Sequence, residues 1–393
     1  AIVIFDPKTG KEEKLLYEDP DFDVSGLGYS RKDKKLTAVS YTGIKHKYHF
    51  FDAERKAMHA KVQKEFPEME VYFVSTNDDE DTFIVRTHSD KSLGAYYLFL
   101  KASGKLTFIG NPAPWLEEKN MASALPIHYQ SRDGLTIHGY LTLPAGYDMD
   151  SAKDLPVVVN PHGGPWARDT WGFNPEIQLM ANRGYAVLQM NFRGSTGFGR
   201  AFWEASFREW GKKMQDDITD GVSWLIEKGI ADKDRVAIYG GSYGGYATLA
   251  GMAFTPDVYA CGIDYVGVSN LFTFMGTIPP YWEPFKKMMY EMVGDPEDEK
   301  DSAMLRAASP VFHADKITSP LFVAQGAKDP RVNVDESDQM VAAMKKRGVE
   351  VEYMVKDNEG HGFRNEENRF EFYRAMEEFL DNHLKNVAEK AEV

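Results

Sequence analysis

Cysteine is nearly absent from this sequence, so its fold cannot depend on disulfide bonds. The single cysteine, Cys261, lies in the apolar segment YACGIDYVGV, where we expect a buried strand. A lone cysteine excludes any disulfide within the chain, and this setting favours core packing over catalysis. Long apolar runs are also missing, because no run approaches the roughly 18 residues that a membrane helix needs. We therefore expect no association with a membrane.

Basic residues are fewer than acidic residues in this sequence. The chain has 46 lysines and arginines against 60 aspartates and glutamates, which gives a formal net charge of −14. Such a balance argues against nucleic acid and anionic membrane surfaces as partners. The sequence also has no metal-ligand cluster and no phosphate-binding glycine loop, so we expect no metal and no cofactor. It leaves open whether the chain forms a homo-oligomer.

The beginning of the chain lacks an initiator methionine and a signal peptide. It starts with AIVIF, which already has the pattern of a strand. We therefore expect a piece of a longer protein, and the compartment stays open between cytoplasm and periplasm. The 393 residues are enough for two domains.

Residues 1–124 have the pattern of a β-rich segment. Short alternating runs such as VYFVS, TFIVRTH, AYYLFLK and LTFIG are separated by polar turns, which predicts consecutive strands joined as hairpins. A weak repeat places Phe5, Phe51 and Phe99 at offsets of 46 and 48. A period in the forties built of four strands is typical of β-propeller blades. The segment is long enough for about two blades, so we expect either the last blades of a truncated propeller or another small β domain.

Residues 125–393 have a different pattern. The segment ALPIHYQSRDGLTIHGYLTLPAGY resembles an opening antiparallel hairpin, and from Leu155 onward expected strands alternate with amphipathic helices. Strands spaced by helices predict βαβ units and a mostly parallel, doubly wound sheet. We therefore expect an α/β domain over 125–393 after the β-rich segment of 1–124.

One serine stands among four glycines in RVAIYGGSYGGY, directly after an expected strand and before an expected helix. Gly240 to Gly244 fit the G-x-S-x-G pattern of a nucleophile elbow, a sharp turn that lifts the serine hydroxyl clear of the sheet. The pattern alone is weak evidence, but its position between strand and helix strengthens it. We predict that Ser242 is a nucleophile.

A serine nucleophile needs a base, and the base needs an acid that orients it. Asp329 follows the expected strand of PLFVAQGAKDPRV, and His361 lies between two glycines after the strand of VEYMVKDNEGHGF. Each alone could be an ordinary loop residue. Together they follow Ser242 in the order serine, acid, histidine that is typical of α/β-hydrolases. Asp357 and Glu359 are rival acids, but they stand too close to His361 in sequence to act across the next loop.

The loop after the strand VVVN contains His162-Gly163-Gly164-Pro165. This matches the HGG-type loop whose backbone N–H helps to bind an oxyanion, together with the N–H of the residue after the nucleophile. We predict an oxyanion hole made by the N–H groups of Gly164 and Tyr243. For His162 a structural role in holding the loop is favoured over a second base.

Taken together, these motifs resemble the prolyl oligopeptidase family of serine peptidases, closest to its acylaminoacyl-peptidase and dipeptidyl-peptidase branch. The likeness covers residues 125–385, where NPHGGPW, NFRGSTGFGR, WGKKMQDDITDGV, GGSYGGY, GAKDPRV and EGHGF occur in family order. It implies an α/β-hydrolase fold, a triad of Ser242, Asp329 and His361, and hydrolysis of short peptides through an acyl-enzyme. It also implies that residues 1–124 are the end of a propeller that would cap the hydrolase.

The resemblance further implies residues that bind the substrate. Arg331, two residues after the acid, would bind a backbone carbonyl of the peptide. The segment VSNLFTFMGTIPPYW would line an apolar pocket for the residue before the cut bond, with Leu271, Phe274 and Val332 as candidates. Leu271 and Phe274 fit an ordinary apolar core equally well.

Two other functions stay open at this stage. A carboxylesterase would use the same triad and oxyanion hole, and fold alone does not choose between esters and amides. Arg331 and the propeller-like segment favour peptides. A catalytically silent binding protein is disfavoured, because every residue type of the triad is present.

Overall fold

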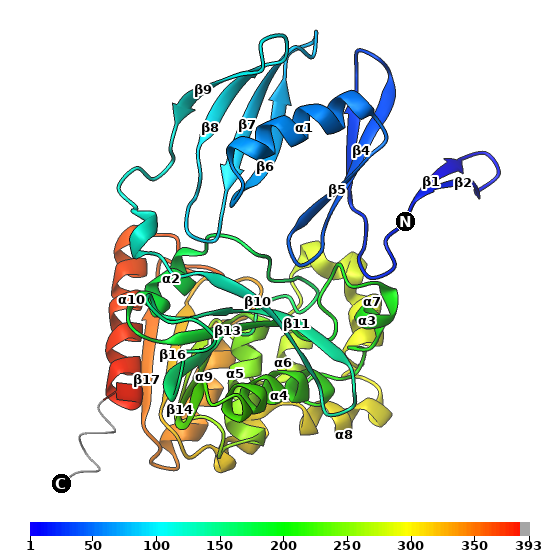
Figure 1. Cartoon of the computed structure of the whole chain (residues 1–393). Coiled ribbons are helices and arrows are strands. Elements are labelled where there is room, and N and C mark those ends of the chain that lie inside the picture. The colour runs from blue at the N-terminus through cyan, green and yellow to red at the C-terminus, as the bar shows by residue number, and fades with distance from the viewer. Residues whose placement is uncertain (386–393) are drawn as a thin grey trace. The chain divides into compact units, whose positions relative to one another are not determined.

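The computed structural model describes residues 1–385, which form two compact units (Figure 1). The first unit comprises residues 1–124, 170–178 and 197–199, and the second comprises 125–169, 179–196 and 200 onward. The main division therefore falls between Ala124 and Leu125, although two short later segments also belong to the first unit. Residues 386–393 of the predicted second domain lie outside the described range. Within residues 1–385, no helix is both long and apolar enough to cross a lipid bilayer.

The first unit is built of antiparallel sheets, as its alternating sequence predicts. Strands β6 to β9 form a four-stranded sheet in chain order, which is the form of a propeller blade, and strands β3 to β5 form a three-stranded sheet. That this unit is the end of a longer propeller stays a prediction. The elements are β1 (Ile2–Asp6), β2 (Lys11–Tyr17), β3 (Gly26–Ser30), β4 (Lys35–Thr42), β5 (His46–Phe50), α1 (Ala53–Glu65), β6 (Glu70–Thr76), β7 (Thr82–His88), β8 (Tyr96–Leu100), β9 (Lys105–Gly110) and the 3₁₀ turn Glu118–Asn120.

The predicted repeat is wrong at its second copy, because Phe51 is followed by a helix. Asp52 caps α1 by accepting a hydrogen bond from the backbone N–H of Arg55 at 2.8 Å. One turn apart on this helix, Met58 and Val62 are buried and join the core of the four-stranded sheet. The helical spacing of these two apolar residues therefore overrides the similarity of Phe51 to the other two copies.

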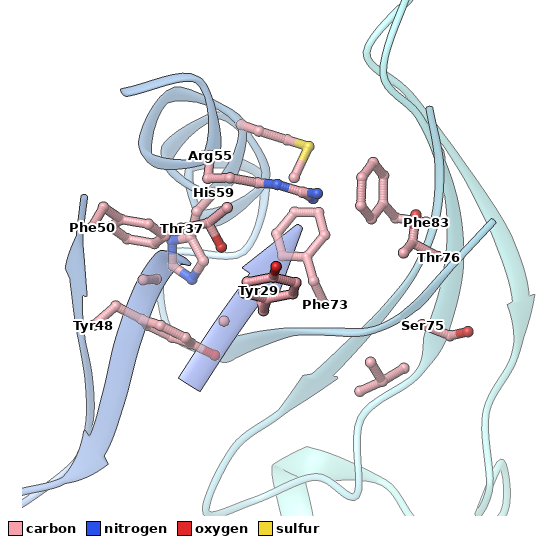
Figure 2. A pocket seen from close by; sticks show the side chains of 14 residues that line it. Tyr29, Thr37, Tyr48, Phe50, Arg55, His59, Phe73, Ser75, Thr76 and Phe83 are labelled. Atoms are coloured by element: carbon pink, nitrogen blue, oxygen red, sulfur yellow. The ribbon is translucent and has the colours of Figure 1, made fainter. Parts of the chain in front are cut away.

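A cavity of about 310 Å³ lies in the first unit, bordered by α1 and by strands of both sheets (Figure 2). Its walls are largely aromatic, with Tyr48, Phe50 and Phe73 among them. The guanidinium carbon of Arg55 lies 4.8 Å from the ring centre of Phe83, and the same side chain forms an ion pair with Glu80. None of the predicted catalytic residues lines this cavity, so it is separate from the predicted chemistry.

The second unit has the predicted α/β architecture. Its eight-stranded sheet has the order β10-β11-β13-β12-β14-β15-β16-β17, in which β11 pairs antiparallel with β13 and every later pair from β13 to β17 is parallel. The central strands are buried along their whole length, which explains their continuous apolar sequence. The strands are β10 (Ala124–Gln130), β11 (Thr136–Thr142), β12 (Leu155–Val159), β13 (Ala186–Asn191), β14 (Ala231–Gly241), β15 (Cys261–Tyr265), β16 (Leu321–Gly326) and β17 (Val351–Lys356).

Helices connect these strands and pack on the sheet. Helix α5 contacts β14 and β15, and α10 contacts β16 near the end of the sheet (Figure 1). There Phe322 of β16 lies 5.9 Å from Phe372 and from Phe379 of α10, measured between ring centres. The helices are α2 (Pro175–Asn182), α3 (Arg200–Glu204), α4 (Lys213–Glu227), α5 (Tyr243–Phe254), α6 (Leu271–Gly276), α7 (Lys286–Met292), α8 (Glu299–Ala307), α9 (Val334–Lys345) and α10 (Glu366–Leu380), with 3₁₀ turns at Pro280–Phe285 and Pro310–Lys316 and a π turn at Asp381–Lys385.

A buried ion pair joins the first strands of the sheet to α4. Arg193, which follows β13, donates from Nε to Asp217 Oδ2 at 2.8 Å and from Nη2 to Asp217 Oδ1 at 2.7 Å. The side chains of Arg193 and Asp217 are 3% and 0% exposed. Arg193 also reaches Asp133 in the loop between β10 and β11 at 2.8 Å. One guanidinium therefore fixes the positions of three elements.

Replacing Asp217 by asparagine leaves the buried guanidinium of Arg193 without its main counter-charge. We expect Asp217→Asn to lower the free energy of unfolding by about 3 kcal/mol or more, as measured by urea titration. Asp234→Asn is the matched control, because Asp234 and Lys233 are 72% and 70% exposed and solvent screens their interaction. Equal losses in the two variants would contradict the structural role of the buried pair.

Candidate active site

Ser242 occupies a tight turn between β14 and α5. Its backbone has φ 59° and ψ −117°, in the region of positive φ that non-glycine residues rarely adopt. Its N–H donates to the carbonyl oxygen of Tyr265 at 2.9 Å, and its own carbonyl accepts from the N–H of Tyr246 at 3.0 Å. The turn is thus held from both sides. The serine side chain stands at the N-terminal end of α5, where the helix dipole favours negative charge.

The glycines around Ser242 are required by close contacts rather than by flexibility alone. A Cβ atom on Gly240 would lie 2.5 Å from the carbonyl group of Gly244, and one on Gly244 would lie 2.2 Å from the carbonyl oxygen of Pro161. Real Cβ atoms do not approach backbone atoms this closely. The G-x-S-x-G pattern therefore follows from the packing of the turn against the loop after β12.

Asp329 and His361 are in direct contact. Asp329 Oδ2 lies 2.7 Å from His361 Nδ1, and the two side chains are 0% and 15% exposed. Asp329 Oδ1 accepts the backbone N–H groups of Arg331 at 2.8 Å and Val332 at 3.0 Å. Because an ionised carboxylate only accepts, Nδ1 is the donor, and a neutral imidazole then keeps a lone pair on Nε2.

The three residues lie at one edge of the sheet. Ser242 follows β14, Asp329 follows β16 and His361 follows β17, and these strands run parallel within the order β14-β15-β16-β17. The carboxyl ends of parallel strands meet at the same edge, where open α/β sheets bind their ligands. The loops after β16 and β17 also pack together, since the N–H of Lys328 donates to the carbonyl of Glu359 at 2.9 Å.

Glu359, one of the two rival acids, has another role. Its carboxylate accepts the backbone N–H groups of Arg364 and Asn365, both at 2.9 Å, and the side-chain amide of Asn368 at 2.7 Å. It therefore closes the loop that carries His361 and stabilises the start of α10.

The loop with His162, Gly163 and Gly164 lies against the turn of Ser242. A Cβ atom on Gly163 would be 3.5 Å from the Cβ of Ser242 and 3.1 Å from the carbonyl oxygen of Gly241. Tyr243 is the first residue of α5, and an N–H at this position has no partner within its own helix. The assignment of the Gly164 and Tyr243 N–H groups to an oxyanion hole stays a prediction.

His162 holds this loop in place. Its Nδ1 lies 2.8 Å from the carbonyl oxygen of Gly163, its Nε2 lies 2.8 Å from Ser195 Oγ, and its ring stacks on Phe192 at 4.3 Å. Burial lowers the pKa of His162 to about 4, so the imidazole is neutral near pH 7. These contacts use both ring nitrogens, which supports the structural role rather than that of a second base.

Of the four predicted substrate-binding residues, one is exposed and three are buried. Arg331 is exposed, and its guanidinium carbon lies 6.0 Å from the ring centre of Trp282. Leu271, Phe274 and Val332 are 1%, 6% and 2% exposed. Phe274 stacks on Trp210, with 6.3 Å between the ring centres, as a residue of the apolar core would. The roles of all four in substrate binding stay predictions.

Tyr265 was missed by the sequence reasoning. It is the last residue of β15, its carbonyl oxygen accepts the N–H of Ser242 at 2.9 Å, and its hydroxyl accepts the backbone N–H of Phe363. Its ring also stacks on Phe372 of α10 at 4.7 Å. This one residue thus connects the serine turn, through its backbone carbonyl, with the loop that carries His361, through its hydroxyl. No local motif marks it, because its partners are distant in sequence.

A second missed residue is Asp264, the neighbour of Tyr265 on β15. Its carboxyl group is 0% exposed and fills the space beside two glycines, so that a Cβ atom on Gly245 or Gly267 would lie 2.4 or 2.1 Å from Oδ1. Burial raises the pKa of Asp264 to about 7, and the backbone N–H of Gly267 offsets only part of this effect. This titratable group therefore lies directly behind α5, next to the serine turn.

The sequence and the fold of this chain resemble those of known proteins. The model of the prolyl oligopeptidase family matches residues 171–387, which include Ser242, Asp329 and His361. The dipeptidyl aminopeptidase BIII of Pseudoxanthomonas mexicana is 42% identical over 99% of this chain and 57% of its own length. Dipeptidyl peptidase family member 6 of Caenorhabditis elegans is 37% identical over 98% of this chain and 54% of its own. The chain thus spans little more than half the length of these relatives.

Solved structures share the fold. The acylaminoacyl peptidase of Pyrococcus horikoshii superposes with a TM-score of 0.75 over 96% of this chain and 58% of its own, at 23% sequence identity. A puromycin hydrolase superposes with a TM-score of 0.69 over 77% of this chain and 45% of its own, at 25% identity. The predicted α/β-hydrolase fold is confirmed, together with a β-rich segment that precedes it.

The raised pKa of Asp264 has a consequence for stability. Between about pH 4 and pH 7 the folded carboxyl keeps a proton that the unfolded one releases, so stability falls as pH rises through this range. We expect Asp264→Asn to flatten this slope, seen as a smaller loss of unfolding free energy from pH 4 to pH 7. Asp257→Asn, at an exposed position, is the control. Parallel curves for the wild type and Asp264→Asn would contradict the assignment.

Proposed function

This chain belongs to the prolyl oligopeptidase family, and on that premise we propose that it is the catalytic part of a serine peptidase that cuts short peptides. The observation that carries the proposal is the 2.7 Å contact between Asp329 and His361, at the sheet edge where β14 ends in Ser242. A serine on a sharp turn, a histidine and an orienting acid are the three groups that acyl transfer requires. The family supplies the expectation that the acyl group comes from a peptide.

The residues act in two half-reactions. Ser242 Oγ attacks the carbonyl carbon of the scissile peptide bond while His361 Nε2 takes the hydroxyl proton. His361 then gives this proton to the leaving amine as the C–N bond breaks, which leaves an ester on Ser242. Water hydrolyses the ester with His361 as base. Asp329 stays ionised throughout and stabilises the imidazolium.

The oxyanion formed in each half-reaction needs preorganised donors. The N–H of Tyr243 belongs to the first turn of α5, and the N–H of Gly164 belongs to the loop that packs on the serine turn. Backbone donors in these positions stabilise the negative charge without reorganisation, and loss of one such donor costs about 2.7–4 kcal/mol in other enzymes. His162 holds this loop through Gly163 and Ser195.

The relatives that match nearly the whole chain suggest the kind of peptide. The Pseudoxanthomonas relative is named as a dipeptidyl aminopeptidase, and the Caenorhabditis relative is named as a member of the dipeptidyl peptidase family. We therefore propose release of dipeptides from a free amino terminus, with Arg331 as a donor to a substrate carbonyl. The exposed guanidinium of Arg331, two residues after Asp329, supports this placement.

Loss of the Ser242 hydroxyl should abolish acyl transfer. We expect Ser242→Ala to lower kcat on a fluorogenic dipeptide amide on the order of 10⁴-fold while circular dichroism stays unchanged. A fluorophosphonate should add once to the wild type, on Ser242, as read by intact mass and peptide mapping. Ser302→Ala is the matched control and should behave as the wild type does. Near-normal turnover in Ser242→Ala would overturn the proposal.

The dipeptidyl proposal makes a separate prediction about the amino terminus. Peptides of four to six residues with a free amino terminus should release dipeptides. The same peptides with an acetylated terminus should react at least about tenfold more slowly, because binding of the free terminus would place the second residue directly before the cut bond. Product masses from matched pairs of peptides decide this. Preference for the acetylated peptides would indicate acylaminoacyl peptidase activity instead, and cleavage of simple esters alone would indicate an esterase.

A further inference from the structure

A chain of buried polar side chains runs from the catalytic acid loop into α9. Gln325, near the end of β16, is 0% exposed, and its amide nitrogen Nε2 lies 3.5 Å from Asp329 Oδ2 and 3.0 Å from the carbonyl oxygen of Val332. This amide therefore reaches across the turn that carries Asp329 and binds both the carboxylate and the far end of the turn.

The orientation of this amide is fixed by its surroundings. Nε2 faces acceptors only, namely Asp329 Oδ2 and the carbonyl oxygens of Val332 and Gly326. On the other side, Oε1 accepts the hydroxyl of Ser337 at 3.0 Å. A flipped amide would place its oxygen against three acceptors, so one orientation is strongly preferred.

Ser337 lies on a helical turn that is anchored at its neighbour Glu336, whose buried carboxylate accepts several hydrogen bonds. Glu336 is 1% exposed, and its Oε2 accepts the backbone N–H groups of Ser269 at 2.9 Å and Asn270 at 2.8 Å. Its Oε1 accepts the hydroxyl of Thr273. Moving this helical turn would leave a buried charge without partners, which is costly.

We propose that Gln325 is a positioning residue for the Asp329–His361 pair, anchored through Ser337 to the first turn of α9. The backbone N–H groups of Arg331 and Val332 hold Asp329 Oδ1, and Gln325 restrains Oδ2, the oxygen that accepts from His361 Nδ1. Gln325 thus sets the angle at which the carboxylate meets the imidazole. The same turn of α9 fixes the segment from Ser269 to Thr273, so the acid loop and this segment share one anchor.

This inference rests on the proposed function for its kinetic consequences but not for its structural ones. Replacing Gln325 by methionine keeps the approximate size of the side chain and removes the hydrogen bonds made by its amide group, while the backbone stays paired in the sheet. We expect Gln325→Met to lower kcat on the order of 10- to 100-fold with KM within about twofold, because a displaced base impairs the chemical step rather than binding. The rate of fluorophosphonate labelling should fall by a similar factor.

Gln215→Met is the matched control. Gln215 is also buried, at 3% exposed, and lies on α4, but its side-chain amide has no hydrogen-bond partner, so this control separates the change from glutamine to methionine from the loss of hydrogen bonds. The same substitution there should leave kcat and the labelling rate unchanged. A Gln325→Met variant that is folded and behaves as Gln215→Met does would overturn the proposal. Where Gln325→Met fails to fold, Ser337→Ala removes only the hydroxyl that orients the amide, and an unchanged kcat in that folded variant would overturn the proposal equally.

Proton NMR, which does not depend on turnover, tests the positioning role of Gln325 separately from the proposed peptidase function. The proton on His361 Nδ1, held by Asp329, should give a low-field proton resonance in the wild type and in Gln215→Met. We expect Gln325→Met to shift or broaden it. If the wild type shows this resonance without any peptidase activity or labelling, the proposed function fails while the positioning role is still judged by the resonance. An identical resonance in Gln325→Met would show that Gln325 does not position the pair.

Discussion

The strained backbone at Ser242 is the constraint on which the site depends. A residue with φ 59° between β14 and α5 can persist only because its surroundings hold it, and they do so through the carbonyl of Tyr265 and the first turn of α5. The close approach of Gly244 to the carbonyl of Pro161 brings the HGG loop against the same turn. The predicted nucleophile and the predicted oxyanion donors therefore share one tightly packed region.

The other predicted catalytic groups, Asp329 and His361, come from the same sheet edge, but they are held by other contacts. Asp329 and His361 lie on loops, where no helix or strand fixes the backbone. Contacts with buried polar groups hold these loops in place instead. Tyr265 links the serine turn to the loop of His361, Glu359 closes that loop, and Gln325 reaches the acid. Each of these contacts satisfies a buried donor or acceptor, so the polar network stabilises the fold while it fixes the geometry.

The first unit shows how a local pattern can mislead. The weak repeat of Phe5, Phe51 and Phe99 suggests strands of successive blades, yet the segment after Phe51 is helical because Asp52 caps it and Met58 and Val62 bury one face. The predicted hairpin pattern of the last four strands of this unit, β6 to β9, is confirmed. Alternation of apolar and polar residues over consecutive short runs therefore predicts strands better than a weak long-period repeat does.

The sequence by itself determined the alternation of strands and helices after Leu155, the α/β-hydrolase fold and the candidate residues Ser242, Asp329 and His361, because periodicity and short motifs are local properties. Only the tertiary structure decided that His361 contacts Asp329, 32 positions away. It also decided that Tyr265 binds the loop of His361, that Asp264 packs beside α5, and that Gln325 reaches Asp329. These contacts join different strands, and their residue types also occur in ordinary cores. No local pattern distinguishes a supporting glutamine or tyrosine from a packing residue until the chain has folded.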